Sequence, residues 1–182
     1  NVSAATVGDL TVLGGSDDDT ILIAEDTFNS DDVIKGEEGT DVLQIDDGAT
    51  LADAAFKNTS GIETLELVVH TGTGSSGAVL GANAQAAGIT KVDISGSRTD
   101  DAFVDASAYT SAVGVTFESS TVSDSIFVGG AGTDTFLNQG AADSTVTGGL
   151  GIDTFTQESS GTLLVTDLGI GGADVFTITA TS

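Results

Sequence analysis

The sequence contains no cysteine, proline, methionine or tryptophan, and its 182 residues include only four basic side chains. Without cysteine the chain forms neither disulfide bridges nor zinc–thiolate sites. The 28 acidic residues give a formal net charge of −24, which excludes nucleic acid and anionic membrane surfaces as partners. No apolar run approaches the length of a membrane span, about 18 residues or more, so we expect no membrane insertion.

The composition nevertheless belongs to a folded protein. Hydrophobic residues make up 39% of the chain and the mean hydropathy is +0.21, unlike a disordered acidic tail. Aspartate provides 21 of the 28 acidic residues, and aspartate is favoured in turns and metal-binding loops. Because folding gathers these charges without disulfides to help, we expect divalent cations to stabilise the fold.

The ends of the sequence carry little information about targeting. The chain begins at Asn1 instead of Met, and residues 1–20 lack the basic and apolar regions of a Sec signal peptide. We therefore expect a processed product or a piece of a longer polypeptide. Residues 1–182 are expected to form one domain, with a candidate internal boundary near residues 70–78.

Short apolar runs alternate with turns rich in Gly, Asp, Ser and Thr, as at residues 20–23, 42–45 and 174–178. With 25 glycines and no proline, this alternation predicts many short strands and an all-β fold. Only residues 50–57 and 82–87 have the pattern of one or two helical turns.

A period runs through the second half of the sequence. Asp residues that precede short apolar strands recur in nearly even steps, at positions 124, 134, 143 and 153. Two of these intervals make one coil with two strands, and coils that repeat in this way predict a parallel β-solenoid. One sheet is expected to carry an inward apolar column, and the opposite sheet to hold residues 102–104, 125–128, 144–147 and 163–166. The predicted column is Ile23, Ile45, Leu67, Ile94, Phe117, Phe136, Phe155 and Phe176.

Two segments, residues 129–136 and 148–155, match the nonapeptide pattern G-G-x-G-x-D-x-U-x. Weaker copies occupy residues 14–21, 36–43 and 169–176. Glycine permits positive φ angles in the turn and exposes backbone carbonyls, and the Asp supplies a carboxylate where the next strand begins.

The coil spacing suits calcium. Stacked strands lie about 4.8 Å apart, and a calcium ion that binds oxygens at about 2.3–2.6 Å spans a similar distance. Two unneutralised carboxylates about 5 Å apart repel by about 3 kcal/mol at an effective dielectric constant of 20. The alternative is that these turns only cap strands. The predicted ligands are Asp134, Asp153, Gly129, Gly130, Gly132, Gly148, Gly149, Gly151, Asp124, Asp143, Asp174, Asp17, Asp19, Asp32 and Asp41.

At these residues the sequence resembles the RTX (repeats-in-toxin) calcium-binding β-roll. It is more closely similar to RTX-type surface-layer proteins and large adhesins of Gram-negative bacteria, through residues 56–67 (F…N…xGIExLxL) and the coil at residues 103–130. The resemblance implies a secreted, cell-surface structural module that folds and self-assembles on binding calcium. Its implied partners are further copies of itself, lipopolysaccharide or another surface glycan.

Other interpretations stay open at this point. Residues 72–77 read G-x-G-x-x-G after a strand, the fingerprint of dinucleotide binding, but no later helix would cover a Rossmann sheet. An adhesin module, a carbohydrate-active β-helix enzyme and a halophilic protein are further alternatives. We expect no catalysis, because Lys57, Lys91, Arg98 and His70 are scattered, and we expect His70 to be an exposed residue at a strand end.

Overall fold

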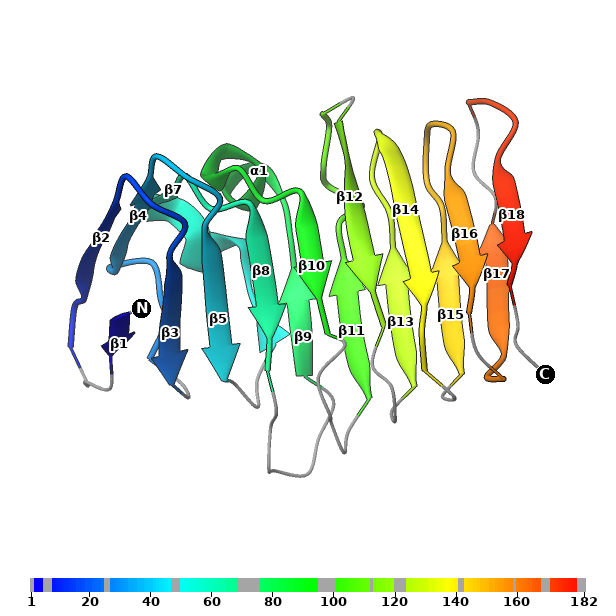
Figure 1. Ribbon diagram of the computed structural model, residues 1–182. Helices are drawn as coiled ribbons and strands as arrows, with labels where there is room; N and C mark the ends of the chain where they lie inside the picture. Colours follow the sequence, from blue (N-terminus) through cyan, green and yellow to red (C-terminus); the bar gives the residue numbers. More distant parts are fainter. Residues whose placement is uncertain are drawn as a thin grey trace.

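The computed structural model describes residues 2–4, 8–24, 27–46, 50–68, 76–94, 101–111, 113–119, 124–140, 143–158, 160–167 and 171–179. The chain winds into a parallel β-solenoid, with its first and last strands at opposite ends of the coil stack (Figure 1). All strand pairs within its three sheets are parallel. The predicted all-β parallel solenoid is therefore confirmed.

The main sheet has nine strands and runs the whole length of the solenoid. In spatial order they are β1 (Val2–Ala4), β3 (Thr20–Ala24), β5 (Val42–Asp46), β8 (Thr64–Leu67), β10 (Lys91–Asp93), β12 (Val113–Glu118), β14 (Thr133–Asn138), β16 (Thr154–Gln157) and β18 (Val175–Ile178). The sheet passes from β8 to β10 across the candidate boundary near residues 70–78.

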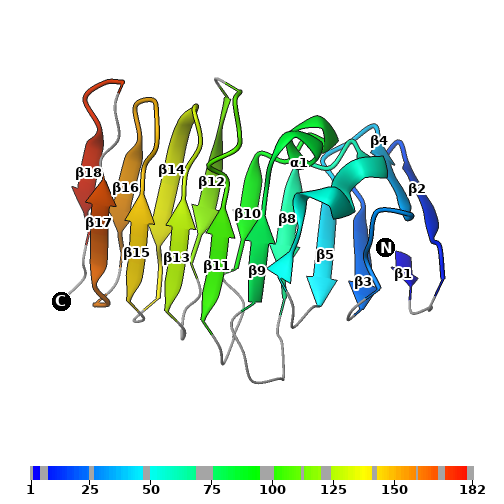
Figure 2. The ribbon, with the colours of Figure 1, turned by 180° about the vertical axis from the view of Figure 1, so that it is seen from behind.

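Two smaller sheets face the main sheet from the other side of the solenoid (Figure 2). The three-stranded sheet comprises β2 (Thr11–Gly15), β4 (Val33–Glu37) and β7 (Thr59–Ser60). The six-stranded sheet comprises β6 (Thr50–Leu51), β9 (Ser76–Val79), β11 (Ala102–Asp105), β13 (Ser125–Val128), β15 (Ser144–Thr147) and β17 (Leu163–Asp167). Its last four strands contain the residues that the period predicted.

The two predicted helical turns form a helix pair. A 3-10 helix, η1 (Asp53–Asn58), contacts the helix α1 (Ala82–Ala87). The N-cap residue of α1, Gly81, has no side chain to cap the helix, and the Asp53 carboxylate supplies this function. It accepts hydrogen bonds from the backbone N–H groups of Gly81 (2.7 Å) and Ala84 (3.0 Å).

Inward-facing residues of the main sheet form two adjacent columns, and the predicted column combined parts of both. The first column is Ile21, Leu43, Leu65, Val92, Phe117, Phe136, Phe155 and Phe176. The second begins at Ile23, Ile45 and Leu67. Phe117 is paired with Val92, not with Ile94, so the prediction changed columns at that step. Both inward positions are apolar there, and the unequal coil lengths did not distinguish them.

The phenylalanine part of the first column stacks as predicted. The rings of Phe117 and Phe136 lie 4.9 Å apart, and those of Phe136 and Phe155 lie 5.1 Å apart, both nearly parallel. All three side chains are buried. Phe176 continues the register but its ring is tilted and lies 6.4 Å from that of Phe155.

The second column becomes polar in the C-terminal half. The Ser119 hydroxyl donates to the Asn138 Oδ1 (2.8 Å), and the Asn138 amide donates to the Gln157 Oε1 (2.9 Å). The Gln157 amide in turn donates to the carbonyl of Gly161 (2.9 Å). These buried side chains satisfy one another from coil to coil, as buried polar groups must.

Candidate functional site

One edge of the main sheet carries a column of acidic side chains at the point where each strand begins. The backbone N–H of Asp19 donates to the carboxylate of Asp41 (2.8 Å). That of Asp134 donates to Asp153 (2.8 Å), and that of Asp153 donates to Asp174 (2.9 Å). The sequence thus correctly predicted that Asp134 and Asp153 stack on successive coils.

The column also contains an acid that the sequence analysis missed. The N–H of Asp41 donates to the Glu63 Oε2 (2.7 Å), so Glu63 takes the place of an Asp in the next coil. The signal was its position, because Glu63 follows Asp41 at the same interval at which Asp41 follows Asp19. Two coils further on, Val115 occupies this place, and its N–H donates to the Asp134 Oδ1 (2.6 Å).

The carboxylates of this column lie inside the turns. Asp41, Asp134 and Asp153 are each at most 1% exposed. Both oxygens of Asp134 accept backbone hydrogen bonds, one from Val115 and the other from Gly130 (2.8 Å). The Oδ2 atoms of Asp41 and Asp153 are buried and accept no hydrogen bond. Two negatively charged oxygens are therefore left without a donor.

In two of the motifs the first glycine makes room for the carboxylate. A Cβ on Gly36 would collide with the Asp41 Oδ2 and with the carbonyl oxygen of Gly61. A Cβ on Gly129 would collide likewise with the Asp134 Oδ2 and the Gly148 carbonyl. In both turns a carboxylate oxygen and a glycine carbonyl of the next coil face the same small space. These are the hard oxygen atoms that calcium prefers.

The later glycines let successive turns stack closely. Cβ atoms on Gly149 and Gly151 would strike the carbonyls of Gly130 and Gly132 in the preceding coil, and both glycines have positive φ angles, 96° and 121°. A groove of about 320 Å³ lies beside these turns, and Gly129, Gly130, Ala131 and Leu150 are among its lining residues.

Burial dominates the electrostatics of Asp134 and Asp153. It raises the pKa of Asp134 above its ordinary value, although the N–H groups of Val115 and Gly130 oppose the shift. Burial also raises the pKa of Asp153 to about 6; the Asp134 N–H opposes this, and the charges of Asp134 and Asp174 add to it. Near neutral pH, ionisation of the Asp153 carboxyl group therefore destabilises the folded turn.

The remaining predicted ligands lie elsewhere. At the opposite edge, before β13 and β15, Asp124 and Asp143 are exposed, and Asp124 accepts the N–H of Asp143 (3.1 Å). Asp32 is buried and its two oxygens accept from Leu10 and Asn29, both at 2.8 Å. Asp17 is exposed. Asp32 thus has the geometry of a turn-capping residue.

The described carboxylates do not gather into clusters. Within the described ranges, no three His, Cys, Asp or Glu side chains are grouped as metal ligands. A calcium ion at the acidic column would therefore be held by no more than two of the described carboxylates, such as that of Asp41 or Asp153, with glycine carbonyls and water completing the shell of about 6–8 oxygens. The donor chemistry fits calcium.

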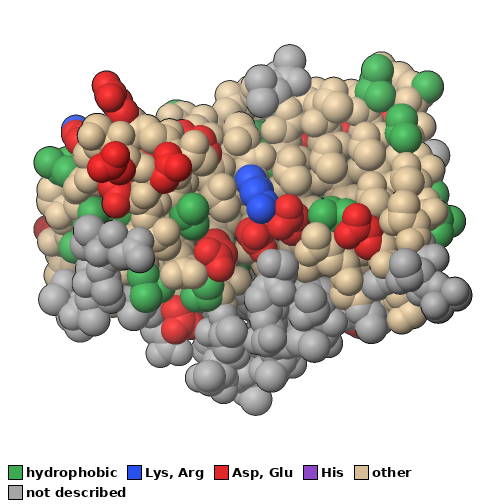
Figure 3. All heavy atoms as spheres, in the orientation of Figure 1, with side chains coloured by type: hydrophobic (Ala, Val, Ile, Leu, Met, Phe, Trp, Pro, Cys, Tyr) green, Lys and Arg blue, Asp and Glu red, His purple; other side chains and the backbone are tan. Residues whose placement is uncertain are grey.

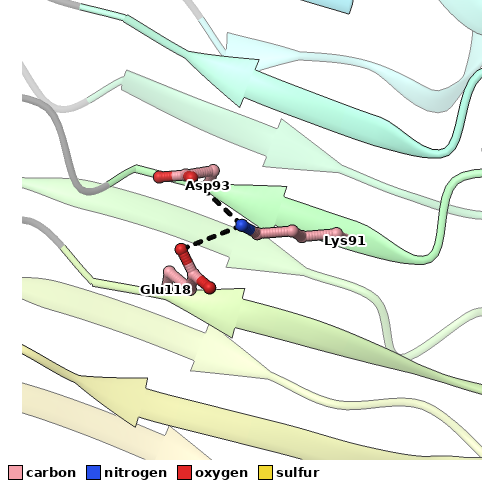
Figure 4. A network of polar contacts seen from close by, with 3 residues as sticks. All are labelled: Lys91, Asp93 and Glu118. Atoms are coloured by element: carbon pink, nitrogen blue, oxygen red, sulfur yellow. Dashed lines mark ion pairs between the residues drawn. The ribbon is translucent and has the colours of Figure 1, made fainter. Parts of the chain in front are cut away.

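The one lysine in the main sheet does have acidic neighbours. The Lys91 Nζ lies 3.3 Å from the Asp93 Oδ2 and 3.0 Å from the Glu118 Oε2 (Figure 4). Partial burial tends to lower the pKa of Lys91, but hydrogen bonds and charges from Glu118 and Asp93 outweigh it and raise the pKa. The two carboxylates beside Lys91 therefore hold it protonated.

Several predictions fall on other segments. His70 and residues 72–75 lie outside the described residues. Gly77, which ends the G-x-G-x-x-G motif, lies in β9, where a Cβ would strike the backbone of Phe103 in β11. The segment that follows this motif is a strand up to Val79 and a helix only from Ala82. Neither described helix is long and apolar enough to cross a membrane.

Comparison with protein-family models, with curated proteins and with solved structures gave no match.

Proposed function

We propose that this chain is a calcium-dependent structural module of a secreted bacterial surface-layer protein, which folds and self-assembles when calcium binds. The observation that carries the proposal is the pair of buried, unpartnered carboxylate oxygens, Asp41 Oδ2 and Asp153 Oδ2. In a dry turn an ionised oxygen without a donor is strongly destabilising, and a bound cation removes that cost.

The charge of the whole chain supports the same proposal. Only four basic residues oppose 28 acidic ones, and the solenoid stacks carboxylates on neighbouring coils. Extracellular calcium at millimolar concentration would neutralise the turns, whereas a medium poor in calcium would leave the chain loosely folded and ready for export. The surface-layer role itself rests on the resemblance to RTX-type proteins.

An adhesin module that binds lipopolysaccharide or a surface glycan is the alternative within the same class. A β-helix enzyme that cleaves acidic polysaccharides would use a basic residue to abstract a proton. Lys91 is a poor base because its pKa is raised. Its two carboxylate neighbours would also repel an anionic polymer.

Calorimetric calcium titration of the wild type and of Asp153→Asn tests the calcium site. The amide oxygen of Asn still accepts the Asp134 N–H, so the turn is retained while the buried charge is lost. We expect the variant to bind fewer calcium ions. Glu158→Gln, an exposed charge change in the same coil, is the control and should bind as the wild type does. Equal stoichiometry in wild type and Asp153→Asn would refute the site.

A further inference from the structure

The outer face of the six-stranded sheet, seen from its outer side in Figure 2, carries an apolar column. Strands β11, β13, β15 and β17 place Phe103, Ile126, Thr145 and Leu164 in register on four successive coils. Ile126 is 45% exposed and Leu164 is 55% exposed. Large apolar side chains that are exposed close together on one sheet face indicate a contact surface.

A groove continues this apolar face beyond the ends of β13 and β15. Val128 follows Ile126 on the same side of β13. It lines the groove of about 320 Å³ together with Ala131, Thr147 and Leu150, and Leu150 is 53% exposed. Hydrophobic side chains are visible over the turns that lead into β16 and β18, at the upper right of Figure 3. The groove can receive an apolar anchor side chain of a partner.

The described charged residues at the ends of β11, β13, β15 and β17 and in the adjoining turns are all acidic. They are Asp101, Asp105, Asp124, Asp143, Asp153, Glu158, Asp167 and Asp174. Of these, Asp101, Asp124 and Asp143 are exposed and lie immediately before β11, β13 and β15. The described lysines lie in β4, η1 and β10, outside this sheet. Within the described part of the chain, the apolar face thus has a negative border.

This border selects the kind of partner by charge. An apolar surface bordered by carboxylates favours a partner whose own apolar residues are bordered by basic ones. A second copy of the chain meets this requirement poorly, because it brings 28 acidic residues and only four basic ones. One of these four, Lys91, is already held by Asp93 and Glu118. The surface therefore suits a different, cationic protein.

The coil spacing suits an amphipathic helix that lies along the solenoid axis. Ile126 and Leu164 are two coils apart, which corresponds to about 10 Å at the usual strand spacing of about 4.8 Å. Helical residues seven positions apart are separated by about 10.5 Å and share one face. Such a helix would place apolar residues i and i+7 over Ile126 and Leu164, and basic residues near Asp124 and Asp143.

We infer that the outer face of β11, β13, β15 and β17 binds a cationic amphipathic helix of a partner protein. The apolar residues of the helix contact Ile126 and Leu164, and the groove beside Leu150 receives one further apolar side chain. Its basic residues pair with Asp124 and Asp143. This binding activity goes beyond the proposed structural role, since it needs the folded solenoid but neither a lattice nor a second copy of the chain.

The test is fluorescence anisotropy with the full chain in millimolar calcium and physiological salt. The probe is a labelled Leu/Lys peptide of about 14 residues with Leu at i, i+3, i+4 and i+7, which as a helix of about 21 Å spans four coils. A scrambled peptide of the same composition keeps the charge but lacks the apolar face. We expect the amphipathic peptide to bind saturably, with a Kd at least about tenfold lower than that of the scrambled peptide, equivalent to about 1.4 kcal/mol.

Variants of the chain locate the contact. Leu164→Thr and Ile126→Thr remove apolar contact area and should each weaken binding of the amphipathic peptide at least about fivefold. Leu13→Thr is the matched control, because Leu13 is 57% exposed on β2 of the three-stranded sheet, and it should bind as the wild type does. Asp143→Asn should also weaken binding, whereas Asp31→Asn, an exposed charge change near β4, should not. Circular dichroism verifies that each variant folds.

Three outcomes would overturn the inference. Equal binding of the amphipathic and scrambled peptides would show only a general attraction to a negative chain. Equal effects of Leu164→Thr and Leu13→Thr would place the contact elsewhere. Sedimentation velocity provides the third: self-association that is lost in Leu164→Thr but kept in Leu13→Thr would assign the face to a contact between copies of the chain.

Discussion

Two effects compete at Asp153 in the acidic column. Its carboxylate joins neighbouring coils by accepting the backbone N–H of Asp134, and this bond favours the charged form. Burial disfavours that form, and in Asp153 burial prevails and raises the pKa to about 6. Neutralising this charge should therefore stabilise the turn, whether by protonation, by a bound cation or by substitution of the carboxylate with an amide.

The first prediction concerns pH in the absence of calcium. Because the folded pKa of Asp153 lies above the unfolded value of about 3.9, the folded state binds the proton more tightly. Stability should rise as pH falls through about 6 and should be lost again as pH rises. Thermal unfolding in chelator should show a higher midpoint at pH 5.5 than at pH 7.5.

Asp153→Asn identifies the group responsible. In chelator this variant should be more stable than the wild type at pH 7.5 and should gain less on acidification. Glu158→Gln, which changes an exposed charge nearby, should retain the full gain. If all three proteins gained equally, general relief of charge repulsion would explain the pH effect, and the burial of Asp153 would be irrelevant to it.

At this scale the sequence predicted the acidic column but not its bonding. The interval between Asp134 and Asp153, equal to that between Phe136 and Phe155, was sufficient to place them on successive coils. It did not reveal that backbone N–H groups occupy most of the carboxylate oxygens, since donors from another coil leave no trace in the sequence. Asp53 was missed for the same reason, because the helix that it caps begins far along the chain, at Ala82.

Among the structural elements, the phenylalanine column shows the clearest difference in burial between neighbouring coils. Phe155 is fully buried between two ring neighbours, and Phe176 in the next coil is half exposed. Phe155→Ala should lower the free energy of unfolding by about 3–5 kcal/mol. Phe176→Ala removes the same atoms and should cost less than half as much, as judged by denaturant unfolding. Equal losses would show that the end of the solenoid is covered in solution.

The polar part of the second column provides another prediction. Asn138→Leu removes the hydrogen bonds that Asn138 makes with the buried Ser119 hydroxyl and with the Gln157 amide oxygen, and each lost bond should cost about 0.5–1.5 kcal/mol. In the N-terminal half the same column is apolar, with Ile23, Ile45 and Leu67. The double variant Asn138→Leu/Gln157→Leu should therefore regain part of the stability that Asn138→Leu loses, as measured by chemical denaturation. A double variant less stable than Asn138→Leu would contradict this account.

The two columns also show how far periodicity extends as a guide. It predicted the last four strands of the six-stranded sheet and the stacking of Phe117, Phe136 and Phe155, because the coils from Phe117 onward recur at an equal interval. It failed between Leu67 and Phe117, where longer connections interrupt the period and both inward positions are apolar. Nor did it predict the polar second column, because Asn and Gln at an inward position resemble residues on an exposed face.

The stability of the whole molecule depends on the balance between apolar burial, which favours folding, and charge repulsion, which opposes it. The columns provide a continuous core between the sheets, while a net charge of −24 opposes closing the coils. A calcium ion that binds only the folded chain stabilises it by about 2.7 kcal/mol at a hundredfold excess over Kd. A few such sites are comparable with the whole stability of an ordinary domain, about 5–15 kcal/mol.

The most direct test of this balance is the thermal unfolding of the full chain by far-ultraviolet circular dichroism, first in chelator and then in millimolar calcium at pH 7.5. Magnesium and potassium chloride at matched ionic strength control for general screening of charge. We expect a weakly structured chain, or one with a low midpoint, in chelator and a large upward shift that only calcium produces. A fully β-structured, thermally stable protein in chelator, unchanged by calcium, would contradict the account.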